Sequence, residues 1–147
     1  AELAGLLLTA ADILETDEYD DLARLICDHA IANGIDTEYG GVYVEGPHAG
    51  GVYDREKEFW QQAEVMIGML EAYRRFGEPR YLDAYENVHR FVFDYGINRE
   101  VGEWWPLLSR EGEPIWRHMG HSWKVSYHTV RCAVECLDRM DRILARS

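Results

Sequence analysis

The segment of the chain with the most chemical potential is WKVSYHTVR, from Trp123 to Arg131. It places an indole, an ammonium, a phenol, an imidazole and a guanidinium at the predicted start of a helix. An indole offers an apolar face to a sugar ring, and an imidazole can accept and return a proton near neutral pH. Trp123 and His128 are therefore candidates for a site that binds a sugar and moves a proton. The alternative is an aromatic lid over a hydrophobic core.

An internal repeat indicates which other residues share this site. A shift of 62 residues places Glu2 on Glu64, and a further step of similar length reaches the neighbourhood of His128. Other matched pairs are Leu8 with Leu70, Ala10 with Ala72, Tyr19 with Tyr81, Gly34 with Gly96 and Gly40 with Gly102. Because each repeat is one structural unit, equivalent positions lie in equivalent places. We therefore expect Glu2, Glu64 and His128 to face one common space.

Each repeat unit reads as two helices followed by a glycine-rich loop. Apolar residues at helical spacing predict helices at residues 2–14, 17–32, 59–76, 80–95 and 127–144. Asp17 is the predicted N-cap of the second helix, and Gly34 its C-cap. Aromatic and aliphatic residues alternate between glycines at 40–53, which predicts a short β-hairpin or an ordered loop. Pro106, Gly112 and Pro114 exclude a continuous helix at 102–116.

These elements predict the fold class. Repeated helical hairpins bury their inner faces only by stacking side by side. The predicted fold is all-α, a partial α/α toroid of helical hairpins with short β-hairpin loops, in a single domain at 1–147. Five helices leave such a stack unfinished. We therefore expect the chain to be part of a longer protein, with self-association of two copies as the alternative.

Composition and charge limit the partners. The formal net charge of −12 argues against nucleic acid and anionic membranes, because both require a basic protein surface. No apolar run is long enough to span a bilayer, and no signal-peptide pattern is present. A cytoplasmic protein with a neutral, small-molecule sugar as substrate fits this composition. Cys27, Cys132 and Cys136 are assigned to the packed interior as reduced thiols.

The histidines show no recognised metal-binding pattern. His118 and His121 lie three residues apart, and His128 follows seven residues later, with Gly120 and aromatic residues between them. This spacing matches no known zinc motif, and the chain contains neither a phosphate-binding loop nor a serine nucleophile elbow. We therefore expect no metal and no cofactor.

Three motifs together resemble the N-acylglucosamine 2-epimerase family, which includes cellobiose 2-epimerases and aldose–ketose isomerases of mannose-like sugars. They are WQQAE at 60–64, GEWW at 102–105 and WKVSYHTVR at 123–131. The resemblance covers nearly the whole chain. It implies an (α/α)6 barrel of twelve helices, of which this chain would form the C-terminal part.

The resemblance also implies roles for particular residues. His128 matches the family's C-terminal catalytic histidine, and Glu64 matches the carboxylate of its Gln-Ala-Glu motif. Glu2 resembles the glutamate of a His-Asp-x-Glu motif whose histidine would precede Ala1. Trp123 matches an indole that lines the sugar site.

The side-chain chemistry of two further residues makes them candidates for the site. Trp60 is the second aromatic candidate for sugar binding, with core packing as its alternative. Arg131 lies one helical turn after His128 and could stabilise an oxyanion or bind a carboxylate. Its alternative is a salt bridge with Glu135.

The expected chemistry is proton transfer at carbon 2 of an aldose, through an enediolate, by a carbohydrate epimerase or isomerase. Trp104 and Trp105 are expected to roof the site, which would favour unsubstituted, mannose-type monosaccharides. Two alternatives remain open. One is a glycoside hydrolase or lyase on an α/α toroid, with Glu2 and Glu64 as paired carboxylates. The other is a non-catalytic helical-repeat binding module.

Overall fold

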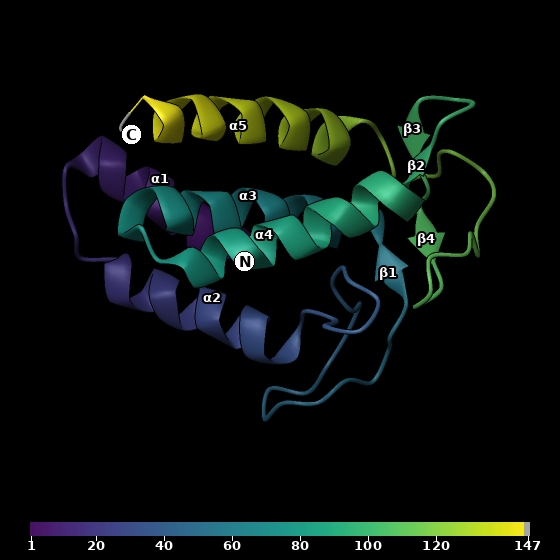
Figure 1. Ribbon diagram of the computed structural model, residues 1–147, viewed down its shortest axis with the longest axis horizontal. Helices are drawn as coiled ribbons and strands as arrows, with labels where there is room; N and C mark the ends of the chain where they lie inside the picture. The colour runs from purple at the N-terminus through teal and green to yellow at the C-terminus, as the bar shows by residue number, and fades with distance from the viewer. Residues whose placement is uncertain (146–147) are drawn as a thin grey trace.

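The computed structural model describes residues 1–145, which form a helical protein with a few very short strands (Figure 1). The helices are α1 (Glu2–Leu14), α2 (Asp20–Asn33), α3 (Phe59–Phe76), α4 (Pro79–Phe91), its π-helical continuation η1 (Val92–Gly96), and α5 (Tyr127–Leu144). The strands are β1 (Lys57–Glu58), β2 (Ile97–Asn98), β3 (Glu103–Trp104) and β4 (Leu107–Leu108). The predicted bounds of α1, α3 and α5 are confirmed.

Helix α3 is the centre of the structure. It lies between α1 and α5 and contacts both, while α4 packs along it and α2 packs against α1 (Figure 1). Most of its side chains are buried as a result. Gly68 permits the close approach of α1, because a Cβ atom there would lie 2.7 Å from the carbonyl oxygen of Ala1. The hairpins α1–α2 and α3–α4 follow each other in the order that the repeat predicts.

The second helix of each hairpin differs from its prediction. Helix α2 begins at Asp20, and its N-cap is Tyr19, so the predicted N-cap at Asp17 is wrong. The carbonyl oxygen of Asp17 instead accepts the N–H of Asp20 and closes a turn before the helix. Gly34 is the C-cap, as predicted. Helix α4 ends at Phe91, and the chain continues directly into the wider π-helical turn η1, so the predicted helix at 80–95 is α-helical only as far as Phe91.

All four strands lie at one end of the helices, beside the N-terminal ends of α3 and α5 (Figure 1). Strands β2 and β3 form a hairpin, whereas β1 pairs with the distant β4. The predicted hairpin region at 40–53 is an ordered loop, with isolated bridges from Ile35 to Val42 and from Glu45 to Asp54. The strand end of the molecule is therefore where loops of both repeat units meet.

Two glutamines of α3 hold the loop of the first unit in place. The Gln62 side chain binds both backbone groups of Val42: Oε1 accepts its N–H at 2.7 Å and Nε2 donates to its carbonyl at 2.8 Å. Gln61 Nε2 donates to the carbonyl oxygen of Val44 at 2.9 Å. These bonds satisfy backbone groups that a loop without a strand partner would otherwise leave unpaired.

A buried ion cluster fixes strand β1. Lys57 Nζ donates to Asp36 Oδ2 at 3.1 Å, Arg110 Nε donates to the same oxygen at 2.7 Å, and both Lys57 and Asp36 are buried. Burial lowers the pKa of Lys57 to about 8. Burial alone would raise the pKa of Asp36, but hydrogen bonds from Arg110 and Lys57 hold it well below its usual range. Since successive strand residues point to opposite sides, this anchor turns Glu58 away from the cluster.

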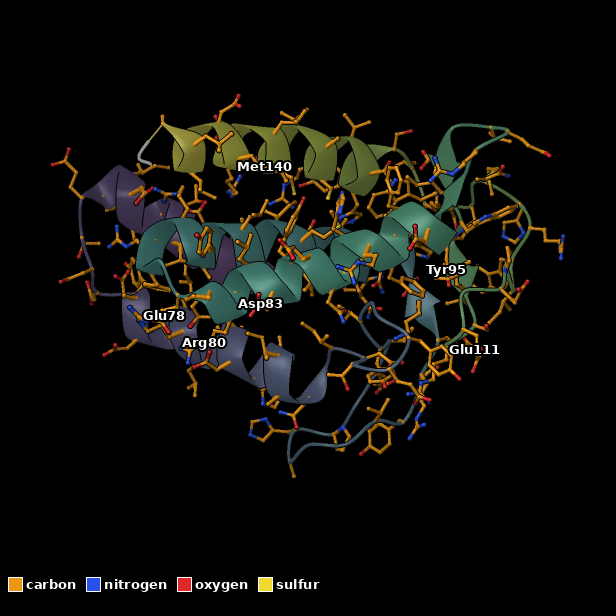
Figure 2. The ribbon with its side chains drawn as sticks, viewed as in Figure 1. Glu78, Arg80, Asp83, Tyr95, Glu111 and Met140 are labelled. Atoms are coloured by element: carbon orange, nitrogen blue, oxygen red, sulfur yellow. The ribbon has the colours of Figure 1, made fainter. Side chains whose placement is uncertain are left out.

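The core contains apolar side chains from all five α-helices, and Met140 reaches into it from α5 (Figure 2). On the opposite side, Arg80 of α4 pairs with Glu78 at 2.7 Å and with Asp28 of α2 at 3.2 Å. No helix within residues 1–145 is both long and apolar enough to cross a membrane.

Helices α1 and α5 lie on the two sides of α3, and both have exposed apolar side chains. On α1 these are Leu3, Leu6, Ile13 and Leu14; on α5 they are Val130, Val134, Leu137 and Leu144. Each is at least half exposed. Exposed apolar edges of this kind usually mark a surface that another structural element covers.

Candidate active site

A buried carboxylate on α3 meets an imidazole and a guanidinium on α5. Glu64 is 2% exposed, and its Oε1 lies 2.8 Å from His128 Nδ1. Arg131 Nη1 donates to both carboxylate oxygens, at 2.5 and 2.6 Å. His128 and Arg131 are one turn apart on α5 and so face α3 together. The predicted alternative for Arg131, an ion pair with Glu135, is not formed: Arg131 pairs with Glu64, and Glu135 pairs with Arg139.

This arrangement determines which nitrogen of His128 can act as a base. A carboxylate only accepts hydrogen bonds, so the Nδ1 that faces Glu64 carries the proton and Nε2 of the neutral ring keeps its lone pair. Burial disfavours the charged form of Arg131, but its hydrogen bonds to Glu64 outweigh this effect and raise its pKa above the ordinary value. Arg131 therefore stays charged and holds Glu64 in the geometry that orients the imidazole.

A cavity of about 500 Å³ opens beside His128. Its walls combine aromatic rings with two carboxylates; the lining residues are Glu2, Glu58, Phe59, Trp60, Trp116, His121, Trp123 and His128. The Trp60 ring centroid lies 5.9 Å from that of His128. The volume is within the range of small-molecule sites. An aromatic wall with a few polar groups is the lining that a sugar requires.

The structure brings the predicted site residues together, but Glu64 and Arg131 do not line the cavity. Glu2, Trp60, Trp123 and His128 line the cavity, and Glu64 lies directly behind His128. Arg131 is not part of the cavity wall, because its guanidinium is occupied by Glu64.

Sequence reasoning missed Glu58 and Phe59 as cavity residues. Both stand directly before Trp60, where β1 passes into α3. The alternation of a strand carries the only sequence signal for Glu58: its neighbour Lys57 points into the ion cluster, so Glu58 must point the other way. This signal can be used only once Lys57 is known to be buried, which the structure shows.

A buried lysine fixes the loop that covers the cavity. The Lys124 side chain is 1% exposed, and its Nζ donates to the carbonyl of Met119 at 3.0 Å and lies 3.3 Å from Glu103 Oε1. The same ammonium lies 5.0 Å from the centroid of the Phe59 ring. Segment 119–124, which contains His121 and Trp123, is thus anchored above the site.

The predicted roof of Trp104 and Trp105 is wrong, because neither residue lines this cavity. Trp104 pairs with Ile97 in the β2–β3 hairpin and packs against the hydrophobic core. Trp116 and Trp123 form the aromatic cover instead. The preference for unsubstituted monosaccharides that rested on Trp104 and Trp105 therefore loses its basis.

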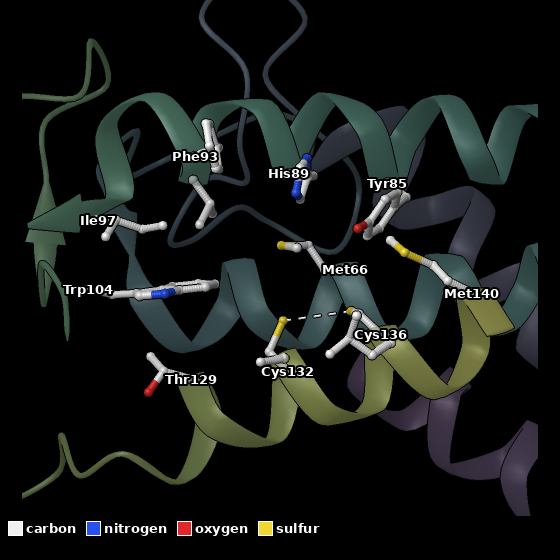
Figure 3. A pocket seen from close by; sticks show the side chains of 13 residues that line it. Met66, Tyr85, His89, Phe93, Ile97, Trp104, Thr129, Cys132, Cys136 and Met140 are labelled. Atoms are coloured by element: carbon white, nitrogen blue, oxygen red, sulfur yellow. Dashed lines mark hydrogen bonds between the residues drawn. The ribbon is translucent and has the colours of Figure 1, made fainter. Parts of the chain in front are cut away.

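A second cavity, of about 400 Å³, lies between α3, α4 and α5 and is lined mainly by apolar and sulfur-containing side chains (Figure 3). Cys132 and Cys136 face each other across 3.8 Å, and both are buried free thiols. The hydrogen bond with Cys136 and burial together raise the pKa of Cys132 well above its ordinary value. The same hydrogen bond lowers the pKa of Cys136, so the expectation of a neutral, unreactive thiol applies to Cys132. The lining contains no carboxylate, so this cavity lacks the paired acid and base found at His128.

Metal-binding geometry is absent from the described part of the chain. Within residues 1–145, no three His, Cys, Asp or Glu side chains are grouped so that they could hold a metal ion.

Comparison with known proteins identifies the family. The profile of the N-acylglucosamine 2-epimerase family matches residues 1–132. A cellobiose 2-epimerase of Eubacterium cellulosolvens is 28% identical over 137 residues, which cover 92% of this chain and 34% of that protein. Among solved structures, a D-mannose isomerase has a TM-score of 0.88 at 26% identity, covering 93% of this chain and 35% of the other. A cellobiose 2-epimerase from Spirochaeta thermophila has a TM-score of 0.85 at 36% identity, with 97% and 37% covered. The chain spans about a third of the length of these relatives, and it belongs to the N-acylglucosamine 2-epimerase family.

Proposed function

We propose that the protein is a carbohydrate epimerase or isomerase that acts at carbon 2 of an aldose. One observation carries the proposal: a buried carboxylate, Glu64, orients the imidazole of His128 at the wall of an aromatic cavity. The relatives support it, because they include cellobiose 2-epimerases and a D-mannose isomerase. An oriented imidazole beside a sugar-sized cavity is suited to proton transfer on a neutral substrate.

In the proposed reaction, Nε2 of His128 removes the proton from the carbon next to the carbonyl of the open-chain sugar. The electron pair of the broken C–H bond forms a C=C bond, and the carbonyl oxygen takes the negative charge of an enediolate. Glu64 stabilises the imidazolium that results, as a buried carboxylate does for other catalytic histidines. Return of the proton to the neighbouring carbon, together with transfer of the carbon-2 hydroxyl proton to the former carbonyl oxygen, isomerises the sugar. Return to the opposite face of the same carbon epimerises it and needs a second proton donor.

The cavity walls provide sugar contacts in this proposal. Trp60 and Trp123 offer ring faces to the apolar side of the sugar, while Glu2 and Glu58 accept hydrogen bonds from its hydroxyl groups. Arg131 acts through Glu64 and is a positioning residue. No metal or cofactor takes part in this scheme.

We further propose that residues 1–147 form part of a single, longer (α/α)6 toroid. The exposed apolar edges of α1 and α5 support this, since each is a face on which a further helical hairpin would stack. The short span relative to the family's members is consistent with it. The buried free thiols favour a reducing compartment such as the cytoplasm.

The test is hydrogen exchange at carbon 2. The full-length protein is incubated in deuterated water with mannose, glucose, cellobiose and N-acetylglucosamine, and the sugars are followed by NMR. Exchange at carbon 2 supports the proposal. Cleavage of the glycosidic bond of cellobiose would indicate a hydrolase, and binding without reaction would indicate a binding module.

The His128→Ala variant connects this activity to the site. We expect it to abolish exchange while leaving the fold intact, because the His128 side chain lies at the edge of the cavity rather than in the core. His89→Ala, on the outer helix α4, is the matched control and should exchange normally. Near-wild-type exchange in His128→Ala would refute the assignment.

A further inference from the structure

A second histidine, His121, lines the same cavity as His128. It opens a tight turn in which its carbonyl oxygen accepts the N–H of Lys124 at 3.0 Å. The side chain of Lys124 is buried and bound to Glu103 and to the Met119 carbonyl. The backbone on both sides of His121 is therefore held, and its imidazole is kept over the cavity.

The hydrogen bonds of His121 define its protonation. Its Nδ1 accepts the backbone N–H of Trp123 at 3.3 Å. A ring nitrogen that accepts carries no proton, so Nε2 of this ring is the N–H donor. That Nε2 is buried and has no hydrogen-bond partner among residues 1–145. A buried donor without an acceptor is unfavourable, and in native proteins it usually has a specific explanation.

The protein groups around His121 do not supply the missing acceptor. The Trp116 ring meets the imidazole at right angles with centroids 5.4 Å apart, and His118 lies at 6.1 Å. Aromatic rings are weak acceptors for an N–H group. The cavity carboxylates of Glu2 and Glu58 form no hydrogen bond with this nitrogen either. An oxygen atom of a molecule in the cavity is the acceptor that fits.

We propose that His121 contacts the substrate directly and donates its Nε2–H to a hydroxyl or carbonyl oxygen of the bound sugar. That the ligand is a sugar rests on the proposed function. The observation that Nε2 of His121 lacks an acceptor is independent of that function. His121 thereby adds a neutral hydrogen-bond donor to a cavity whose other polar wall groups include the acceptors Glu2 and Glu58. A polyol presents both donors and acceptors, so it is matched by a wall that offers both.

Two substitutions separate this role from a structural one. His121→Asn places an amide oxygen near Nδ1, so it can still accept the Trp123 N–H, but it removes the Nε2 donor. His121→Gln places an amide N–H near Nε2 and gives up the Nδ1 acceptor. His118→Asn is the matched control, because His118 stands in the same loop, stacks on Trp116 and does not line the cavity.

The readouts are the dissociation constants of mannose and cellobiose, from the fluorescence of the cavity tryptophans, and exchange at carbon 2. For His121→Asn we expect binding about 3- to 10-fold weaker, as for the loss of one hydrogen bond. His121→Gln should remain within about twofold of wild type, and His118→Asn should match it. The reverse order of Asn and Gln would show that His121 only supports the turn at Trp123, and unchanged binding in both variants would also overturn the inference.

The same measurements distinguish this inference from the proposed function. If the wild type binds sugar without exchange at carbon 2, the proposed function fails, and the binding data still decide the role of His121. If the wild type exchanges and His121→Asn behaves identically in both assays, only the role of His121 fails. If none of the sugars binds to the wild type, both are refuted.

Discussion

Replacement of Glu64 by glutamine tests the central contact of the site. Glu64→Gln keeps the size of the side chain and removes its charge. The amide can then present an N–H to Nδ1 of His128, which would place the ring proton on Nε2. The imidazole would point a proton, instead of a lone pair, into the cavity. Arg131 would at the same time lose the carboxylate that accepts both of its short hydrogen bonds.

The size of the effect follows from these contacts. Losing general-base catalysis lowers a rate by about 10²- to 10⁴-fold, and a wrong imidazole tautomer removes most of that catalysis. Breaking a buried ion pair costs about 3–5 kcal/mol, but the side chains of Arg131 and His128 are 19% and 23% exposed, so water offsets part of the loss. We expect the free energy of unfolding to fall by about 2–3 kcal/mol, which lowers Tm by roughly 5–10 °C.

Exchange at carbon 2, measured by NMR well below the lowered Tm, separates chemistry from folding. Glu71→Gln is the matched control. Glu71 lies two turns further along α3, is also buried, and pairs with Arg139 of α5 at 2.7 Å and with Arg74. Its replacement should cost similar stability and leave exchange unchanged. The reasoning is refuted if Glu64→Gln keeps exchange within about threefold of wild type, or if Glu71→Gln loses it equally.

Three further predictions concern the ion cluster, the cavity rim and the exposed edges. The pKa of Asp36 is lower in the folded chain than in the unfolded chain, so as pH falls below about 4 the unfolded carboxyl takes up its proton first and the contribution of Asp36 is lost. In urea unfolding, Asp36→Asn should therefore be about 3 kcal/mol less stable than wild type at pH 7. That gap should narrow near pH 2.5, and a constant gap would contradict the assigned pKa shift. Trp123 is 86% exposed, so Trp123→Ala should change the free energy of unfolding by less than about 0.5 kcal/mol. It should weaken mannose binding, measured by calorimetry, by about 2- to 10-fold. Unchanged affinity would show that Trp123 does not contact the sugar. The isolated 147-residue chain should self-associate through the apolar edges of α1 and α5 in analytical ultracentrifugation, and a stable monomer would argue against the partial toroid.

The helices could be predicted because their signals are local. In α1, α3 and α5 the apolar residues recur at helical spacing from the first turn to the last, and the observed bounds agree with the predicted ones. The repeat then predicted that Glu2, Glu64 and the His128 region face one space. Glu2 and His128 line the same cavity, whereas Glu64 lies behind His128 and does not line it. The N-cap at Asp17 failed because its carbonyl closes a turn onto Asp20, a competition between two local structures that composition does not resolve.

The remaining features depend on contacts between distant segments. Arg131 has an acidic residue at i+4, and the helix alone favours Glu135, but tertiary packing places Glu64 closer. Trp104 looked like a roof because it lies in a loop, yet its place in the hairpin turns it toward the core. The sequence does not show that Nε2 of His121 lacks an acceptor, because this depends on which ring nitrogen binds the backbone N–H of Trp123.

The motif WQQAE shows why such distant contacts still leave a compact sequence signature. Side chains within one helical turn point in different directions. Residues of this motif can therefore contact the cavity and His128 on one side and the 42–44 loop on another. Trp60 and Glu64, four residues apart, serve the cavity and His128. Gln61 and Gln62, between them, bind the backbone of the 42–44 loop. A substitution at either glutamine would remove hydrogen bonds that tie this loop, which leads into β1 and Glu58, to α3. The short motif therefore joins the first unit's loop and the cavity wall to neighbouring positions of one helix.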